Sequence, residues 1–210
     1  GKTLAFGVPL ISKLLDGGEH DARGRNALKP KGASALVLAP TRELANQIGD
    51  QMRSLTEGTP VNTMVVYGGV RVGTQANKLR NGVHILVATP GRLLDLVDRG
   101  AVTLRDTRFL VLDESDMMLD MGFAPSLKRI VSMLPPKRQT MLFSATMSKS
   151  MAEVAKLYLK KPVRVEVTRA GETADNLTQE LYYLQKPDKM TKLLSLIQKH
   201  GGERTLVFGR

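Results

Sequence analysis

The sequence predicts an α/β fold, with a mostly parallel sheet covered by helices on both faces. Short, nearly continuous apolar runs alternate with segments whose apolar residues recur every three or four positions. Such apolar runs are typical of strands buried on both faces, and the helical segments supply the crossovers that parallel strands require. Apolar residues make up 42% of the 210 residues, which is enough for a substantial core.

The alternation can be followed along the chain. A helix is expected over residues 4–15. In the next expected helix, residues 42–55, Leu44, Ile48 and Met52 fall at helical spacing. The expected pairs of strand and helix are 33–41 with 42–55, 63–69 with 72–81, 84–90 with 91–100, 108–114 with 123–134, and 139–146 with 148–159, followed by a strand over 163–167.

A polar, aperiodic stretch divides the chain. Residues 168–178 contain one glycine and no hydrophobic period, so they are predicted to form a linker after a first domain over 1–167. Residues 179–210 then predict the beginning of a second α/β domain: a strand over 179–184, a helix over 188–200 and a strand over 204–208. A second polar stretch, residues 16–33, is expected to be an exposed loop.

Composition narrows the classes of function. The formal net charge of +11 favours a polyanionic partner, although simple solubility accounts for it equally well. The absence of cysteine excludes disulfides, thiolate nucleophiles and cysteine-based zinc sites. His20, His84 and His200 show no metal-ligand spacing, and no apolar run approaches the ~18 residues of a membrane-spanning helix. No signal peptide is visible.

The first three residues are the tail of a phosphate-binding pattern. Gly1-Lys2-Thr3 opens directly onto a helical segment. Backbone amides at a helix N-terminus attract phosphate, a lysine ammonium reaches the outer phosphates, and a threonine hydroxyl ligates magnesium. A bare tripeptide is weakly specific, so this interpretation depends on the rest of the chain.

The strand expected over 108–114 ends in a cluster of acids. Asp113, Glu114 and Asp116 place three carboxylates in four positions. In an open α/β sheet the ligand crevice lies at the carboxyl ends of the strands. There Asp113 would hold magnesium, and Glu114 would orient and deprotonate an attacking water. The alternative is that the acids only cap the helix that follows. Gly-Lys-Thr elsewhere in the same domain favours the nucleotide site.

Further loops are expected at the same edge. Ser144, Ala145 and Thr146 end a strand, and their hydroxyls could bond Asp116 or simply cap a helix. Small residues, exposed amides and arginines suit a sugar-phosphate backbone, although each such loop could equally be a tight turn. The loops in question contain Pro40, Thr41 and Arg42, Gly68 and Gly69, and Thr89, Pro90, Gly91 and Arg92. Aromatic residues are only 4% of the chain, so stacking of nucleic-acid bases on aromatic side chains is not expected.

Six motifs in this order resemble the DEAD-box ATP-dependent RNA helicases. They are GKT (1–3), PTRELA (40–45), GG (68–69), TPGR (89–92), DESD (113–116) and SAT (144–146). The segments MLDMGF (118–123) and RTLVF (204–208) also match, and the bacterial RhlE-like subgroup is most similar. The resemblance implies two RecA-like P-loop NTPase domains that close on ATP, Mg²⁺ and RNA and separate duplexes locally.

The resemblance also implies a role for each matching residue. The catalytic residues would be Lys2, Asp113 and Glu114. The ATP-binding residues would be Gly1, Lys2, Thr3 and Asp113, of which Thr3 and Asp113 would hold the metal. The residues coupling nucleotide to domain closure would be Asp116, Ser144, Ala145 and Thr146. The RNA-binding residues would be Pro40, Thr41, Arg42, Gly68, Gly69, Thr89, Pro90, Gly91 and Arg92.

The chain departs from the family pattern in two ways. Ser115 stands where the family has Ala, and its hydroxyl is expected to compete for the partners of Asp116. Met117 replaces an Arg and would remove an ion pair, so weakened coupling is expected. The upstream adenine-recognising segment, the strand feeding the phosphate loop and most of the second domain are expected to be missing, leaving this piece inactive by itself.

The expected partner is therefore RNA, gripped by its backbone with little sequence preference. Ribonucleoprotein, RNA-degradation or ribosome-assembly partners, a monomeric state and a cytoplasmic location without membrane contact are expected as well. Two alternatives stay open: an RNA-binding or annealing module that has lost its ATPase, and a superfamily 2 DNA translocase.

Overall fold

The protein is described by a computed structural model. It describes residues 1–16, 28–166, 178, 180–200 and 204–209. The chain forms two compact units, Gly1–Ala170 and Gly171–Arg210, which are considered separately. Most of the predicted loop over 16–33 and nearly all of the predicted linker over 168–178 lie outside the described residues. No described helix is both long and apolar enough to span a bilayer.

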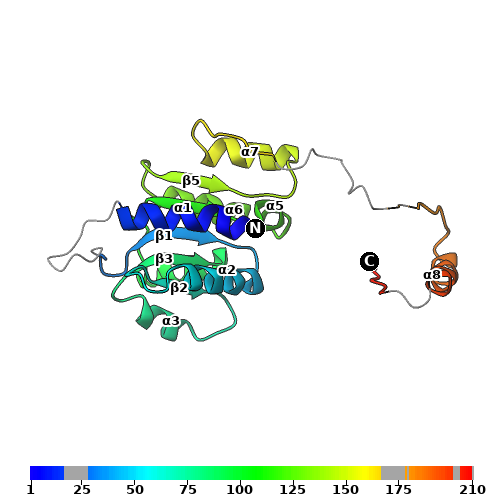
Figure 1. The fold of residues 1–210 in the computed structure, drawn as a ribbon, viewed down its shortest axis with the longest axis horizontal. Coiled ribbons are helices and arrows are strands. Elements are labelled where there is room, and N and C mark those ends of the chain that lie inside the picture. Colours follow the sequence, from blue (N-terminus) through cyan, green and yellow to red (C-terminus); the bar gives the residue numbers. More distant parts are fainter. Residues whose placement is uncertain (17–27, 167–177, 179, 201–203, 210) are drawn as a thin grey trace. The chain divides into compact units, whose positions relative to one another are not determined.

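The first unit is built on a parallel sheet. Its strand order is β2-β3-β1-β4-β5, and every neighbouring pair is parallel. Figure 1 shows β5, β1, β3 and β2 following one another across the sheet. The strands are β1 (Ala33–Leu38), β2 (Thr63–Val66), β3 (Val83–Ala88), β4 (Phe109–Leu112) and β5 (Gln139–Leu142). The predicted α/β class with a parallel sheet is confirmed.

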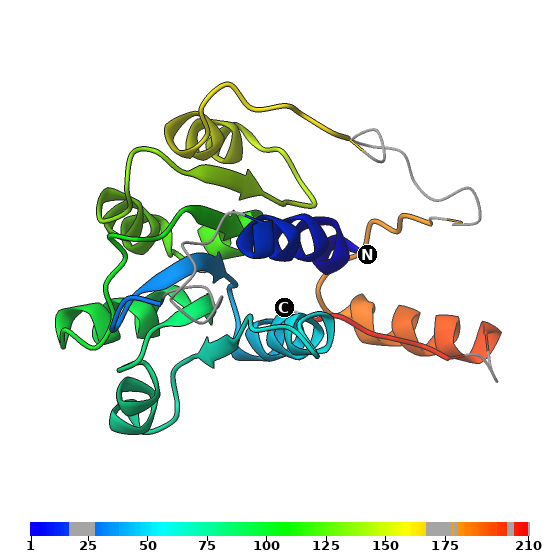
Figure 2. The ribbon, with the colours of Figure 1, turned by 60° about the vertical axis from the view of Figure 1, so that its left-hand side comes forward.

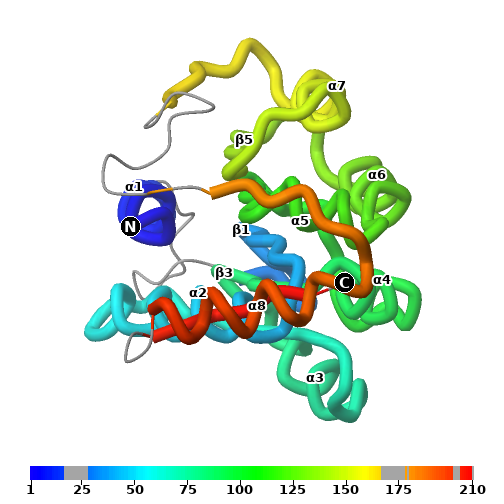
Figure 3. The backbone as a smooth tube through the Cα atoms, turned by 90° about the vertical axis from the view of Figure 1, so that its right-hand side faces the viewer, coloured from blue at the N-terminus to red at the C-terminus, as the bar shows by residue number. Residues whose placement is uncertain are grey.

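Helices cover both faces of this sheet, with α1 and α2 on one side and α4 and α6 on the other (Figure 3). The alternation along β1 shows why. Ala35 and Val37 pack with residues of α1 and α2, whereas Leu36 and Leu38 belong to the core beneath α4 and α6. The helices are α1 (Lys2–Asp16), α2 (Arg42–Leu55), α3 (Val72–Lys78), α4 (Pro90–Asp98), α5 (Ser115–Asp120), α6 (Ala124–Ser132) and α7 (Lys149–Tyr158).

Three predicted strands do not form in the described residues. The segments 163–166, 180–184 and 204–208 carry no strand. Val163 and Val165 are 90% and 82% exposed, which shows that the apolar alternation of this segment has no sheet to pack on. A strand exists only through hydrogen bonds to a neighbour, and none of the described segments pairs with these three.

The second unit contains one described helix, α8 (Asp188–Lys199), as the periodicity predicted. Its apolar residues are largely uncovered, and Met190 and Leu194 are 64% and 54% exposed. The assignment of this unit to a second RecA-like domain stays a prediction.

Two glycines lie at the ends of similar turns that follow helices α3 and α4. Gly82 follows α3 and Gly100 follows α4, and each donates its N–H to the carbonyl three residues earlier. Both have positive φ, +78° and +62°. A Cβ on Gly82 would lie 2.3 Å from the carbonyl oxygen of Lys29, whereas nothing lies within 4 Å of a Cβ on Gly100. Only Gly82 therefore combines a left-handed backbone with close packing.

We expect Gly82→Ala to lower the free energy of unfolding of the first unit by roughly 2–4 kcal/mol, because the methyl group meets a backbone oxygen as well as left-handed strain. Gly100→Ala carries the strain alone and should cost about 1–2 kcal/mol. Denaturant titration of both variants measures the difference, and equal losses would contradict the role given to the Lys29 contact.

Candidate functional site

The predicted motif loops meet at one edge of the sheet. In the parallel register, Leu38 pairs with both Ala88 and Leu112, Val66 pairs with Ala88, and Leu112 pairs with Leu142. The segments that leave the strands after these residues must therefore emerge in one row. The expectation that the loops share the carboxyl edge is confirmed, whereas the role of each residue stays a prediction.

Helix α1 brings Lys2 to the acid cluster. Its N-terminus lies at the end of the sheet toward which β5 and β1 point (Figure 2). The Lys2 Nζ donates to Glu114 Oε1 at 2.7 Å. This hydrogen bond raises the pKa of Lys2, with nearby acids adding to the effect. Lys2 is thus paired with the acid cluster through Glu114.

The backbone at Glu114 explains how the strand leads into the site. Glu114 has φ 50° and ψ 51°, a left-handed conformation that is uncommon for a residue with a side chain. This turn ends β4 and starts α5, a short helix that the sequence periodicity did not reveal. It places the carboxylate of Glu114 near Lys2, while Asp113 faces inward. Strained backbone of this kind is often found where a side chain must be aimed.

Asp113 is a buried carboxylate that forms no salt bridge with a described residue, although the charge of Lys2 acts on it. It is 3% exposed, and its Oδ1 accepts the Glu114 N–H at 3.0 Å. Burial raises the pKa of Asp113, and the charge of Glu114 adds to this effect. A carboxylate in this state gains from a bound cation. Asp113 therefore fits the expected magnesium site. Thr3, in the first turn of α1, is the other residue that would hold the metal.

The residues expected to couple nucleotide to domain closure are joined by hydrogen bonds. The backbone N–H and the hydroxyl of Thr146 both donate to Asp116 Oδ2 at 2.9 Å. Ser144 Oγ donates to the Thr146 carbonyl at 2.6 Å, and Met117 N–H donates to Asp116 Oδ1. The predicted bond between Asp116 and the hydroxyls after β5 is thus confirmed for Thr146. It links the loops after β4 and β5 directly.

These bonds set the charge state of Asp116. Partial burial raises its pKa, but the bonds from Thr146, Met117 and Ser144 together outweigh burial, and the pKa is lowered. Asp113 and Asp116 are therefore shifted in opposite directions although they are three residues apart. Asp113 accepts one backbone hydrogen bond, whereas Asp116 accepts from Met117 and twice from Thr146.

The predicted competition by Ser115 is wrong. Ser115 is fully buried, and its Oγ donates to the carbonyl of Leu112 at 3.1 Å. Its N–H donates to the carbonyl of Phe143 at 3.0 Å. The hydroxyl is used by the backbone of β4 and leaves the partners of Asp116 undisturbed. Met117 is 47% exposed, and its proposed effect on coupling stays a prediction.

The loops after β1 and β3 present helix N-termini at this edge. Thr41 caps α2 by accepting the Leu44 N–H at 3.2 Å, and Thr89 precedes α4 without a side-chain cap bond. Pro40 and Pro90 are buried and fix the two turns. Amides at helix N-termini attract phosphate groups, so this pair of termini suits a nucleic-acid backbone.

The loop after β2 lies beside α2. The Arg42 guanidinium lies over the Tyr67 ring, 4.9 Å from its centroid. Gly69 has φ +83°, and nothing lies within 4 Å of a Cβ on Gly68 or Gly91. The glycines therefore leave backbone amides open to a ligand, and Arg42 offers an exposed cation next to them.

Arg92 differs from Arg42 because it is enclosed. Its side chain is 10% exposed. One terminal nitrogen donates to Gln75 Oε1 at 2.8 Å, and the other donates to the carbonyl of Val70 at 3.0 Å. Both terminal nitrogens are therefore bound within the protein, and the predicted RNA contact of Arg92 stays a prediction. Gln75 was missed by sequence reasoning, although a polar residue on the apolar face shared with Val72 and Leu79 was a usable signal.

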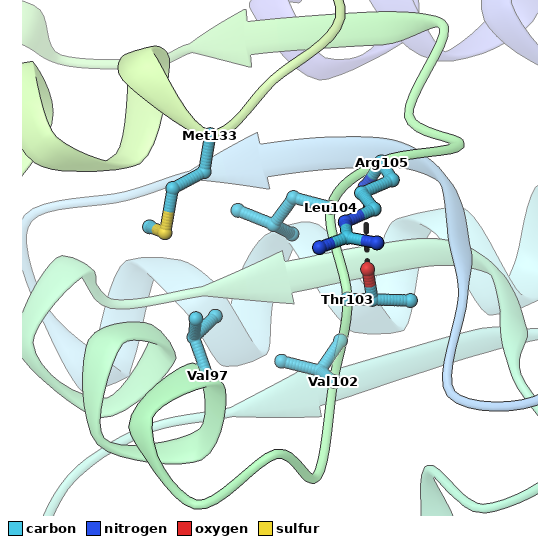
Figure 4. A pocket seen from close by; sticks show the side chains of 6 residues that line it. All are labelled: Val97, Val102, Thr103, Leu104, Arg105 and Met133. Atoms are coloured by element: carbon cyan, nitrogen blue, oxygen red, sulfur yellow. Dashed lines mark hydrogen bonds between the residues drawn. The ribbon is translucent and has the colours of Figure 1, made fainter.

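A cavity elsewhere in the unit takes no part in this edge. It has a volume of about 410 Å³ and lies between the end of α4, the segment leading into β4 and the residue that follows α6 (Figure 4). Its lining consists of Val97, Val102, Thr103, Leu104, Arg105 and Met133. The residues around Thr103 lead into β4, and Met133 lies between α6 and β5, so the cavity belongs to the amino edge of the sheet.

Because the pKa values of Asp113 and Asp116 are shifted in opposite directions, replacing each aspartate by asparagine should shift the melting temperature in opposite directions. Asp113→Asn removes a charge that burial disfavours and keeps an oxygen for the Glu114 N–H, so the melting temperature near neutral pH should rise by about 2–4 °C. Asp116→Asn loses bonds to an ionised acceptor and should lower it by about 4–8 °C. Calorimetry of the unliganded protein tests both, and shifts of the same sign would contradict this account.

The contribution of Asp116 to the stability of the fold also depends on pH. Its folded-state pKa lies below the ordinary value of 3.8, so the ionised carboxylate stabilises the fold above that pH. The stabilisation is lost as the pH falls through the folded-state pKa. The difference in melting temperature between the wild type and Asp116→Asn should therefore shrink in acid. A difference in melting temperature that stays constant with pH would contradict the charge-based explanation.

The comparison with known families agrees with this geometry. The family model described as DEAD/DEAH box helicase matches residues 1–154. The match contains all five strands and the loops that carry Lys2, Asp113, Glu114 and Asp116 at one edge. It covers well over half of the 210 residues. The chain belongs to the DEAD/DEAH box helicase family.

Proposed function

We propose that this chain serves an ATP-dependent RNA helicase of the DEAD-box branch, acting in the cytoplasm on RNA bound through its backbone. ATP hydrolysis would be coupled to RNA binding and to local strand separation. The observation that carries the proposal is the position of Lys2, Asp113, Glu114 and Asp116 at the edge that also presents Arg42 and the two helix N-termini. One edge therefore carries residues suited to nucleotide and residues suited to RNA.

The nucleotide would be held at the start of α1. The amides near Gly1 and the ammonium of Lys2 would bind phosphate oxygens, and Thr3 and Asp113 would hold Mg²⁺. The metal would neutralise phosphate charge that develops during transfer. Lys2 now binds Glu114 at 2.7 Å, and an ammonium drawn to phosphate would release that carboxylate. Glu114 would then be free to orient water and take its proton.

RNA would be bound along the neighbouring loops. Thr41, Arg42, Gly69, Thr89 and Gly91 offer hydroxyls, a cation and backbone amides, which are the groups that contact sugar and phosphate. None of them reads a base edge, so little sequence preference is expected. The Asp116–Thr146 bonds join the loops after β4 and β5 and would transmit the state of the nucleotide to this surface.

The proposal predicts ATP hydrolysis that RNA stimulates and DNA of the same sequence does not. We expect Glu114→Gln to retain ATP binding and to lose at least about 100-fold in hydrolysis, because the general base is removed while the phosphate contacts stay. The test measures phosphate release by the protein at its full length, with and without single-stranded RNA or DNA. An equal stimulation by DNA would assign the chain to a DNA translocase.

A control separates catalysis from folding. Glu153 is an exposed residue of α7 and is not one of the predicted site residues. Glu153→Gln therefore makes the same chemical change outside the site. It should leave hydrolysis unchanged. RNA binding without hydrolysis in the wild type would contradict the proposal and indicate a binding or annealing module instead.

A further inference from the structure

Arg92 and the buried Gln75 form one hydrogen-bonded strut. Gln75 Oε1 accepts from Arg92 at 2.8 Å, and Gln75 Nε2 donates to the carbonyl of Tyr67 at 3.3 Å. The second terminal nitrogen of Arg92 donates to the carbonyl of Val70 at 3.0 Å. The two carbonyls lie on either side of Gly68-Gly69. The strut therefore holds both ends of the loop after β2 against the first turn of α4.

The two side chains of the strut are largely buried and occupied by contacts within the protein. Gln75 is 7% exposed, and the Arg92 side chain is 10% exposed. Asp95 lies one turn further along α4. Its Oδ2 is 3.8 Å from Arg92 Nε and partly balances the charge of the guanidinium. A planar guanidinium is suited to this position because its fixed fork can serve two acceptors at once, which a lysine ammonium cannot do with the same geometry.

The strut also reaches the exposed cation of this edge. The Tyr67 carbonyl is bound by Gln75, and the Tyr67 ring supports the Arg42 guanidinium 4.9 Å from its centroid. Arg42 lies close to Gly69: a terminal guanidinium nitrogen of Arg42 is 3.9 Å from the place that a Cβ added to Gly69 would occupy. A shift of the loop would therefore move the glycine amides and the support of Arg42 together.

We propose that Gln75 and Arg92 are positioning residues that set the RNA-binding loop 67–70, and that Arg92 does not itself contact phosphate. This inference rests on the proposed function, since it requires RNA at the carboxyl edge. It differs from the role that the family resemblance implied for Arg92. The loop amides and Arg42 touch the RNA, and the strut keeps them at the spacing that a sugar-phosphate backbone requires.

The experiment measures binding of a labelled oligouridine to the full-length protein by fluorescence anisotropy. A non-hydrolysable ATP analogue and Mg²⁺ are present, and the salt concentration is varied. Gln75→Leu and Arg92→Gln should each weaken binding by about tenfold, since both remove bonds to a charged group that orders the loop. The double variant should be no weaker than either single one, because the two residues act as a unit.

Salt dependence distinguishes positioning from direct contact. Each phosphate contact in single-stranded nucleic acid contributes about 0.7 to the slope of log affinity against log salt. Arg92→Gln should leave this slope unchanged, whereas Arg42→Ala should reduce it by about 0.7. A reduced slope for Arg92→Gln together with unchanged binding by Gln75→Leu would overturn the proposal, since Arg92 would then bind phosphate itself.

Two conservative variants guard against misfolding. Gln75→Glu keeps an acceptor for Arg92 but cannot donate to the Tyr67 carbonyl, so it should lose less affinity than Gln75→Leu, which loses both bonds. Arg92→Lys keeps the charge but cannot serve both acceptors, so it should lose about tenfold, whereas a direct phosphate contact would survive the change. Gln51→Leu, an exposed glutamine on α2, controls for the substitution. Wild-type affinity in Arg92→Lys would overturn the strut even if Gln75→Leu did not fold.

Failure of the proposed function has a different signature. If the wild type did not bind the oligouridine, or if Arg42→Ala bound it as well as the wild type, RNA would not lie at this edge at all. If Arg42→Ala lost affinity while Gln75→Leu, Arg92→Gln and Arg92→Lys did not, the edge would bind RNA and the strut alone would be refuted.

Discussion

Every proposed contact depends on the parallel register of the sheet. The strands run the same way and end in one row, so the five loops that follow them lie at one edge; the last residues of the strands are Leu38, Val66, Ala88, Leu112 and Leu142. The N-terminus of α1 lies at the same edge, and there Lys2 Nζ is 2.7 Å from Glu114 Oε1. An antiparallel arrangement would divide these loops between two edges, and no combined site for nucleotide and RNA could form.

Within that edge, the carboxylates are differentiated by their surroundings. Asp113 is buried with one backbone donor, Glu114 is aimed at Lys2 by a left-handed turn, and Asp116 accepts from both sides. Each environment suits a different task, namely holding a cation, serving as a base and joining two loops. The strand alone could not give three neighbouring acids three states. The turn at Glu114 and the loop that carries Thr146 supply the difference.

Much of this arrangement could be predicted from the sequence because it depends on local patterns. The helix over Arg42–Leu55 follows from its apolar period, and the shared edge follows from the alternation of strands and helices. The bond between Asp116 and Thr146 could be anticipated because both residues closely follow the carboxyl ends of neighbouring strands. In each case the decisive information lies within one segment or in the topology.

What the sequence did not reveal depends on contacts between segments. Arg92 reads as an exposed cation until Gln75, 17 residues away, is seen to enclose it. The strand predicted over 163–167 does not form in its described part, 163–166, because strand formation requires a hydrogen-bonded neighbour, which no local pattern supplies. Ser115 was expected to disturb Asp116, but its rotamer sends the hydroxyl to Leu112 instead.

The central claim is that nucleotide and RNA are bound at one edge and are linked through Asp116. The most direct test compares the affinity of the full-length protein for single-stranded RNA with and without a non-hydrolysable ATP analogue and Mg²⁺, in the wild type and in Asp116→Ala. The account predicts that the analogue tightens RNA binding by at least about tenfold in the wild type and has little effect in the variant. An RNA affinity that does not respond to nucleotide in the wild type would contradict it.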